Sequence, residues 1–312
     1  MTRILLSVLL IASLCNDSLR AAPQFTSLES VAGTKPQSTQ LNNPDSSGLQ
    51  KVAFQTKDLS QPQASSDSQQ FDNGNDPTIV RKRLTLKSEY MRFRNGLAVN
   101  TTTVQTSFPI LQEESFKMNF GFDLPLNYYE VESPINTVLS GVGDMKAQLL
   151  AIVPRSEKLT FLLGSNLWLP TAEQQLLQLP DLGDYTDVDL GTGKFRFEPL
   201  IGAVYFINEK TFVIPLYAHD ISFSGKPESP DINRGTTRIF VNRNLERGWY
   251  LSLETQFLVN YSNDNDLDAM QKFELGKAFK NGTVFYAKPG VGIAPGPFNR
   301  DWALELGLRF VF

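Results

Sequence analysis

DWALELGLRFVF, the stretch of sequence at residues 301–312, decides the fold class of this chain. Large apolar residues alternate in it with small or charged ones, and the last residue of the chain continues the apolar series. Successive side chains of a β-strand point to opposite faces, so this period of two predicts a strand with one wholly apolar face. The apolar face carries Trp302, Leu304, Leu306, Leu308, Phe310 and Phe312, and the other face carries Ala303, Glu305, Gly307, Arg309 and Val311.

Three upstream stretches, at residues 116–126, 194–201 and 249–261, show the same alternation of apolar with polar side chains. The alternation by itself also fits a water-soluble sandwich, in which one sheet face is buried and the other is wet. The predicted strands, however, run about ten to thirteen residues, whereas soluble strands typically have roughly 5–6. That length matches the ~9–11 residues with which a tilted strand crosses a bilayer.

Connections between the predicted strands alternate between short turns and long polar loops, as in outer-membrane barrels. We expect turns at residues 112–114, 155–158, 208–210, 245–248 and 281–282, and loops at 95–101, 127–137, 171–193, 225–235, 262–270 and 294–301. A sheet that spans a bilayer must close on itself, because lipid offers no partner to an unpaired backbone N–H or C=O group. The sequence therefore predicts an all-β fold: a closed antiparallel transmembrane β-barrel of about twelve strands over residues 81–312. Alternation is weak at residues 81–95, 98–111 and 236–243, where strand boundaries are least defined.

The first 80 residues differ from the rest. Arg3, the apolar run 4–14 and the small residues near Ala21 have the layout of a secretory signal, which we expect to occupy residues 1–21. Cys15 leaves a lipoprotein signal open as the alternative. Residues 22–80 are rich in Gln, Ser, Asn, Asp and Pro, and they carry too little apolar surface to offset the entropy of ordering. We predict a disordered periplasmic tail there, with a plug or a partner-binding arm as the alternative.

Composition excludes several classes of function. The chain has 312 residues and a formal net charge of −4, which argues against nucleic acid as a partner. One Cys and one His are too few for a structural zinc site or a disulfide framework, and we predict no metal and no cofactor. Beyond the first 15 residues, no apolar run approaches the ~18 residues of a membrane-spanning helix. An α-helical membrane protein is therefore excluded.

Charged residues recur on the strand face that points into the predicted barrel. Six are cations and six are anions, whereas a ring of one sign would have indicated an ion-selective pore. The mixed set predicts a lumen that is cross-linked by ion pairs and is narrow or plugged. Either the charges only satisfy one another inside a structural barrel, or they line the path of a small solute. The predicted pore-lining residues are Lys117, Asp123, Asp144, Lys146, Lys194, Arg196, Glu198, Glu254, Lys272, Glu274, Glu305 and Arg309.

Three weaker motifs bear on catalysis and ligand binding. His219 is the only imidazole, and Ser222, three residues later on one strand, points to the opposite face and cannot pair with it locally. The run Asp-Asn-Asp-Leu-Asp at residues 264–268 begins like a calcium loop but lacks the Gly and the closing Glu, which favours solvated loop charges. Gly-Thr-Gly-Lys at residues 191–194 lacks the Walker spacing and predicts a flexible entry into a strand. We predict no catalytic residue and no metal site.

Four short motifs of this chain point to a known family: GVGD at residues 141–144, LPT at 169–171, LGTG at 190–193 and FELGKAF at 273–279. Together with the aromatic end of the chain, they resemble the bacterial outer-membrane family named after the MetA pathway of phenol degradation. The resemblance covers roughly residues 90–312, and Ala172 stands where the family usually has a Gly after Leu-Pro-Thr. The resemblance implies an outer-membrane barrel that passes small, often hydrophobic or aromatic, compounds, and it supplies no catalytic residues.

We therefore expect passive passage of small solutes, hydrophobic or aromatic ones included, across the outer membrane of a Gram-negative-type cell. An outer-membrane enzyme that modifies lipid through His219 and a structural barrel without transport are the alternatives. The expected partners are outer-membrane lipid and lipopolysaccharide, the solute itself, and the barrel-assembly machinery acting on the C-terminal strand that ends at Phe312.

Overall fold

The computed structural model describes residues 72–94, 96–131, 137–178, 185–262, 265–294 and 300–312. The predicted signal and the predicted tail up to residue 71 lie outside these described residues. Within the described ranges, no helix has both the length and the apolarity to cross a membrane. Helical structure there is limited to one 3-10 turn, η1 (Glu246–Gly248).

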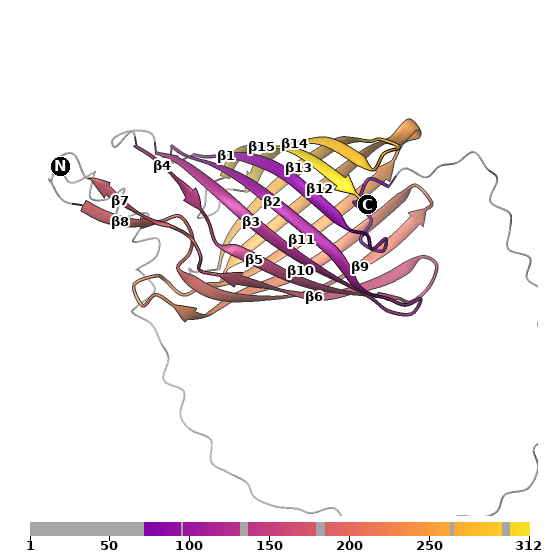
Figure 1. Cartoon of the computed structure of the whole chain (residues 1–312), viewed down its shortest axis with the longest axis horizontal. Coiled ribbons are helices and arrows are strands. Elements are labelled where there is room, and N and C mark those ends of the chain that lie inside the picture. Colours follow the sequence, from indigo (N-terminus) through magenta and orange to yellow (C-terminus); the bar gives the residue numbers. More distant parts are fainter. Residues whose placement is uncertain (1–71, 95, 132–136, 179–184, 263–264, 295–299) are drawn as a thin grey trace, which may run out of the picture. The chain divides into compact units, whose positions relative to one another are not determined.

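Twelve positions around one closed antiparallel sheet make up the barrel (Figure 1). The first strand pairs with both the second and the last, and β2 pairs with β3, which completes the ring. The wall strands are β1 (Arg83–Phe93), β2 (Leu97–Gln112), β3 (Lys117–Val131), β4 (Thr137–Val142), β5 (Met145–Pro154), β6 (Leu159–Leu169), β9 (Lys194–Asn208), β10 (Thr211–Gly225), β11 (Asn233–Asn244), β12 (Trp249–Asn260), β13 (Asp266–Ala278), β14 (Thr283–Ala294) and β15 (Arg300–Val311). Strands β4 and β5 both pair with β3 and share one position, while β7 (Gln174–Gln178) and β8 (Tyr185–Asp189) form a separate hairpin. The predicted closed barrel of about twelve strands is confirmed.

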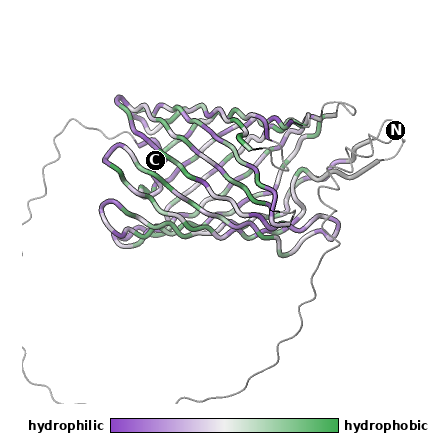
Figure 2. Tube along the Cα trace, turned by 180° about the vertical axis from the view of Figure 1, so that it is seen from behind, coloured by the Kyte–Doolittle hydropathy of each residue, from purple (hydrophilic) through white to green (hydrophobic). Residues whose placement is uncertain are grey.

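The outer face of the barrel is apolar and the inner face is polar, as the alternation predicts. On β15, Leu306 is 47% exposed while its neighbour Glu305 is 6% exposed. On β9, Ile201 is 56% exposed and Arg196 is 5% exposed. Figure 2 shows hydrophobic and hydrophilic residues alternating along the wall. The exposed apolar side chains form a belt suited to the hydrocarbon of a bilayer and not to water.

The five predicted short turns are confirmed, at residues 113–116, 155–158, 209–210, 245–248 and 279–282. The first predicted long loop is wrong, because residues 94–96 alone join β1 to β2, with Gly96 in the left-handed region at φ +87°. Strand β2 runs for 16 residues. Its outward residues Asn100 and Thr102 are of types common in loops, and both hydrogen-bond to Ser88 on β1. Polar residues on the outer face thus conceal the alternation in this part of the sequence.

Replacing Leu306 by arginine places a charge midway along β15 on the outer face, where it costs roughly 2–4 kcal/mol in a bilayer. We expect the free energy of unfolding in lipid vesicles, measured by denaturant titration, to fall by about that amount. Leu84→Arg is the matched control, because Leu84 lies opposite Phe310 near the short-turn end, where the cost is roughly 0–1 kcal/mol. Equal losses for the two variants would contradict a bilayer around the barrel.

Candidate functional site in the barrel lumen

Residues 72–80, here called the strap, cross the end of the barrel that carries the short turns. The side-chain amide of Asn73 donates to Asn244, the last residue of β11, at 2.8 Å. The ammonium of Lys117, the first residue of β3, donates to the backbone carbonyl of Thr78 at 3.1 Å. Strands β3 and β11 lie on nearly opposite sides of the ring, so the strap spans the opening between them.

The strap also has apolar and internal contacts. Its last residue, Val80, packs on a cluster of inward side chains formed by Ile152, Leu162, Val204, Phe212 and Ile214. Within the strap, Asp76 accepts hydrogen bonds from the backbone N–H of Thr78 at 2.9 Å and from its hydroxyl at 2.6 Å. Burial raises the pKa of the Asp76 carboxyl above its ordinary value, and the hydrogen bonds from Thr78 oppose that shift. The described part of the predicted tail therefore contacts the lumen, as the plug alternative describes.

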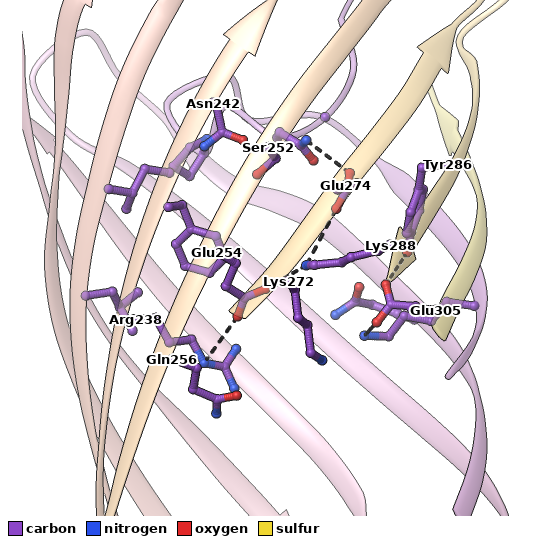
Figure 3. A pocket seen from close by; sticks show the side chains of 18 of the residues that line it. Arg238, Asn242, Ser252, Glu254, Gln256, Lys272, Glu274, Tyr286, Lys288 and Glu305 are labelled. Atoms are coloured by element: carbon purple, nitrogen blue, oxygen red, sulfur yellow. Dashed lines mark hydrogen bonds and ion pairs between the residues drawn. The ribbon is translucent and has the colours of Figure 1, made fainter. Parts of the chain in front are cut away.

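On the lumen side of the strap lies a cavity of about 390 Å³, with Gly74, Asn75 and Pro77 among the residues that line it (Figure 3). The two walls of this cavity differ in chemistry. The apolar wall comes from β5, β6, β9, β10 and β11, and consists of Leu150, Leu162, Leu200, Ile214, Leu216 and Phe240. The charged wall comes from β1 and from β11 to β15, and consists of Lys87, Glu89, Arg238, Glu254, Lys272, Glu274, Lys288, Glu305 and Arg309. A molecule in the cavity would meet hydrocarbon on one side and ionised groups on the other.

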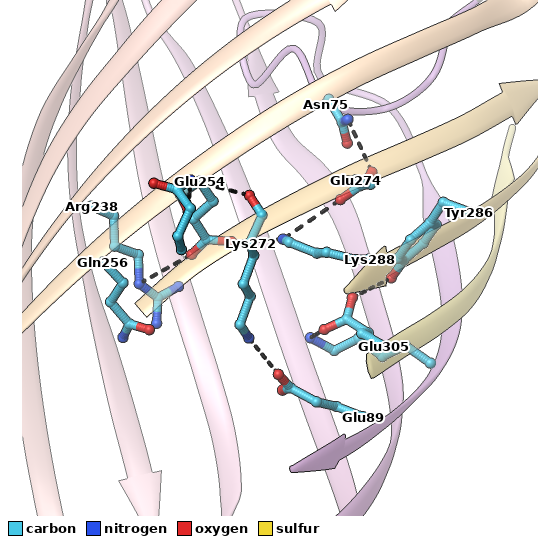
Figure 4. Close-up of polar contacts among 12 residues, drawn as sticks. Asn75, Glu89, Arg238, Glu254, Gln256, Lys272, Glu274, Tyr286, Lys288 and Glu305 are labelled. Carbon is cyan, nitrogen blue, oxygen red and sulfur yellow. Dashed lines mark hydrogen bonds and ion pairs between the residues drawn. The ribbon is translucent and has the colours of Figure 1, made fainter. Parts of the chain in front are cut away.

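The charged wall is a set of neighbouring ion pairs, here called the ion-pair network (Figure 4). Lys288 lies between two carboxylates, 2.6 Å from Glu254 and 3.5 Å from Glu274. All three side chains are largely buried, so each charge depends on its partners for the solvation that it has lost. The further pairs are Arg238 with Glu254 at 3.9 Å, Lys87 with Glu305 at 3.7 Å, and Lys272 with Glu89.

Two tyrosines add neutral donors to this network. The hydroxyl of Tyr250 donates to Glu274 at 2.8 Å, and the hydroxyl of Tyr286 donates to Glu305 at 2.9 Å. The ring of Tyr286 lies directly over Gly307, where a Cβ atom would be 2.1 Å from it. A glycine at this place is therefore a steric requirement of the tyrosine–carboxylate contact.

A second charged cluster lies toward the other end of the lumen. Arg196 and Arg234 both bond to the carboxylate of Asp220, the latter at 2.8 Å. The guanidinium of Arg196 lies 4.3 Å from the ring centre of Trp168, and the ammonium of Lys146 lies 5.3 Å from it. These cation–π contacts hold the indole among inward-facing charges.

Two of the motifs that carry the family resemblance meet at Asp144. Its carboxylate accepts hydrogen bonds from the backbone N–H and the hydroxyl of Thr192, both at 2.7 Å. The N–H of Ala172 donates to the same carboxylate at 3.4 Å. Its methyl group fits because residue 191 is a glycine: a Cβ atom on Gly191 would lie 2.5 Å from the Cβ atom of Ala172. The Gly-Thr-Gly-Lys run at 191–194 is therefore a turn bound to a carboxylate. The N–H and the hydroxyl of Thr192 are both used by Asp144 and are not free to bind a phosphate.

The third motif joins the same place. Thr171 donates its hydroxyl to the carbonyl of Gly143 at 3.2 Å, and the carbonyl of Leu190 accepts from the amide of Asn127 at 2.8 Å. Leu190 itself is fully buried. The long connection between β6 and β9 is thus tied down at both of its ends, beside the break between β4 and β5.

The structure divides the twelve predicted pore-lining residues into groups. Five line the cavity: Glu254, Lys272, Glu274, Glu305 and Arg309. Lys117 binds the strap instead. The other six make polar contacts toward the opposite end of the lumen: Asp123 with Lys146, Lys194 with Asp231, Arg196 with Asp220, Glu198 with Asn166 and Trp168, and Asp144 with Thr192. That any of them lines a path for solute stays a prediction.

Sequence reasoning missed several residues of the cavity. Lys288 stands beside Pro289 in a glycine-rich strand, and Arg238 lies in a strand with weak alternation. The turn at residues 279–282 holds the signal that locates Lys288, because counting forward by twos from Val284, just after the turn, places Lys288 on the inward face of β14. The apolar wall had no such signal, since inward leucines look like any other strand residues.

Asp268 is a correction to the predicted loop of solvated charges. It points inward on β13, is 0% exposed, and accepts hydrogen bonds from Arg300 at 3.0–3.1 Å. Arg300 in turn donates to Gln256 at 3.0 Å. Asp264 lies outside the described residues. Among the described residues, no group of three His, Cys, Asp or Glu side chains is placed to hold a metal ion.

His219 faces outward, on the side opposite to the lumen. Its ring stacks on Tyr261 at 5.5 Å, and its Nδ1 atom lies 2.9 Å from the hydroxyl of Tyr217. The hydroxyl of Ser222 is engaged elsewhere, with the backbone N–H of Ile232 at 2.8 Å. The contacts that the structure gives His219 are thus with tyrosines, and none of them favours the lipid-modifying alternative.

No protein-family model and no curated protein sequence matches the chain. Among solved structures, it is similar to the COG4313 outer membrane channel from Pseudomonas putida F1, with a TM-score of 0.61 and 14% identity over 75% of this chain and 96% of that one. It is also similar to the translocator domain of the autotransporter NalP from Neisseria meningitidis, with a TM-score of 0.50 and 9% identity over 77% of this chain and 91% of that one. The fold is that of an outer-membrane barrel. Membership of the family named after the MetA pathway stays a prediction.

Gly307→Ala should destabilise the barrel, because the new Cβ atom would lie 2.1 Å from the Tyr286 ring and would force its hydroxyl away from Glu305. We expect a loss of about 1–3 kcal/mol in the free energy of unfolding, measured by denaturant titration. Gly121→Ala is the matched control, since the nearest atoms to a Cβ there are 3.6 Å away. A loss at Gly121 as large as that at Gly307 would argue against the steric explanation.

Asp144→Ala should release the connection between β6 and β9, because Thr192 and Ala172 lose their shared acceptor. We expect limited proteolysis of the folded protein to cut faster between residues 171 and 193, by several-fold, with the barrel still heat-modifiable on a gel. Asp123→Ala removes a carboxylate that pairs with Lys146 on the wall, and it should leave the cleavage rate unchanged. Equal acceleration in both variants would show that Asp144 is not a specific tie.

Proposed function

We propose that this protein is an outer-membrane channel through which small solutes pass passively. The observation that carries the proposal is the cavity of about 390 Å³ inside a closed barrel whose outer face is apolar. A barrel of small diameter can fill its interior with side chains, so a purely structural barrel has no need of this space. The likeness to a solved outer membrane channel agrees with the proposal through the fold alone.

The two walls of the cavity support an amphipathic solute. A hydrophobic or aromatic body would lie against the apolar wall, for instance between Leu162, Leu200 and Phe240. Its polar group would face the ion-pair network on the opposite wall, where Lys272 and Lys288 supply donors. Placing each part of the solute against matching chemistry avoids the cost of burying a polar group without a partner.

The same proposal includes the cellular setting. The signal at residues 1–21 would export the chain, the barrel-assembly machinery would act on the strand that ends at Phe312, and lipopolysaccharide would surround the outer belt. The short-turn end and the strap would then face the periplasm, since short turns are periplasmic in barrels of this kind.

Single-channel recording in planar bilayers tests the proposal and the part that the strap has in it. In a Cys15→Ser background, cysteines at positions 73 and 244 replace two asparagines whose side chains are 2.8 Å apart. Joining them with a short, reducible bis-methanethiosulfonate reagent should lower the conductance, because it pins the strap across the opening. Reductant should restore the conductance.

The control is Asn73→Cys alone, treated with the same reagent, and its conductance should change little. Vesicle swelling with benzoate and with a sugar of similar size then compares amphipathic with wholly polar solutes, and benzoate should enter faster. The folded protein is recorded both intact and with residues 72–80 deleted. If neither form conducts, the proposal of a channel is wrong and the structural barrel is favoured.

A further inference from the structure

A second, smaller cavity of about 120 Å³ lies beside the main one. The two share Gln105, Gln148 and Arg309 among their lining residues. Arg83 lines the smaller cavity only, and it belongs to β1 whereas Arg309 belongs to β15. The small cavity therefore has two guanidinium groups, one from the first strand and one from the last.

These two arginines are close neighbours. Arg309 stands opposite Thr85 in the pairing of β15 with β1, which makes Arg83 its diagonal neighbour on the same inward face. The two positive charges repel one another, whereas the strap carboxylates of Asp72 and Asp76 attract Arg83 from beyond ion-pair distance. Each also donates to a backbone carbonyl of the strap, Arg83 to Gly74 and Arg309 to Asn73.

The strap satisfies the pair only in part, although Arg309 also donates to the side-chain oxygen of Asn75 at 2.8 Å. The Nε atom of Arg83 is buried and has no hydrogen-bond partner within the described ranges. No ion pair within 4.0 Å joins either guanidinium to a carboxylate of the described residues. Of the strap's own acids, Asp72 pairs with Arg81 at 3.2 Å and Asp76 accepts from Thr78.

Three other lumen arginines each form an ion pair with a carboxylate. Arg196 and Arg234 share the carboxylate of Asp220, and Arg300 is held by Asp268. A buried guanidinium with no carboxylate in direct contact is costly, and two together cost more, because each desolvated cation also repels the other. An oxoanion offers what both lack, since guanidinium groups bind such anions through short, charge-assisted hydrogen bonds.

We propose that Arg83 and Arg309 form a binding site for one small oxoanion group: a carboxylate, a sulfate or a phosphate. The hydroxyls of Thr85 and Ser107 and the amide of Gln105 line the same cavity and supply further donors. Its volume of about 120 Å³ suits a single such group and is too small for a nucleotide. The site goes beyond the proposed channel, because binding there requires the folded barrel and the strap but not passage of a solute.

Calorimetric titration of the folded full chain in detergent, in a low-chloride buffer, tests the site with inorganic sulfate and with benzoate as the two probes. Sulfate should bind with one site per chain. Arg83→Gln and Arg309→Gln should each weaken binding at least 10-fold. Ser107→Ala removes one donor without touching a charge, and it should weaken binding a few-fold while the barrel folds normally. Competition by benzoate would show that the site accepts a carboxylate as well as a free inorganic anion.

Two controls separate this site from other effects. Arg238→Gln removes a lumen arginine that lies near Glu254, and Arg234→Gln removes a lumen arginine that bonds to Asp220 while both site arginines remain. Both variants should bind sulfate like the unmodified protein. The proposal is overturned if the unmodified protein does not bind sulfate, if binding survives in Arg83→Gln and Arg309→Gln, or if Arg238→Gln abolishes it equally. Absence of conductance in bilayers leaves it unaffected.

Discussion

The pairing of the first strand with the last is the constraint on which the rest of this structure depends. Strand β1 meets β15 along its whole length, from Arg83 opposite Val311 to Phe93 opposite Arg300. In hydrocarbon, an open edge would leave a row of N–H and C=O groups without partners, so the sheet is viable there only when this seam is shut. Closure also gives the alternation its meaning, because only a closed sheet has an inside and an outside.

Some of the ion pairs inside this ring connect strands that are not adjacent in the sheet. Direct cross-strand neighbours such as Glu254 and Lys272 are available, yet Glu254 pairs most closely with Lys288, which is one strand further on. Lys272 on β13 reaches Glu89 on β1, past two intervening strands. Bonds of this kind join strands that the backbone ladder does not connect, so they resist flattening of the wall. Around the main cavity they gather on one side, and the wall opposite them is apolar.

Much of the architecture was predictable from the sequence, because a period of two and short turns are local properties. The alternation that predicts the C-terminal strand lies within residues 301–312, and the turn at 279–282 is marked by its own Asn-Gly pair. Strand β2 was harder, since its outward side chains Asn100 and Thr102 are polar and both hydrogen-bond to Ser88 on β1. The alternation gives the face of a side chain but not its partner, so the pairing of Lys288 with Glu254 depends on curvature that only the folded ring defines. The strap was missed because specific hydrogen bonds, more than apolar burial, hold it in place.

The position of the strap has a consequence for the order of assembly. Its carbonyls are held by Arg83 on one side of the seam and by Arg309 on the other, so its docking place does not exist on an open sheet. The strap can therefore settle only after the two ends of the chain's sheet have met. Until then Arg83 and Arg309 are not side by side, so the nine-residue segment cannot make both of these bonds at once.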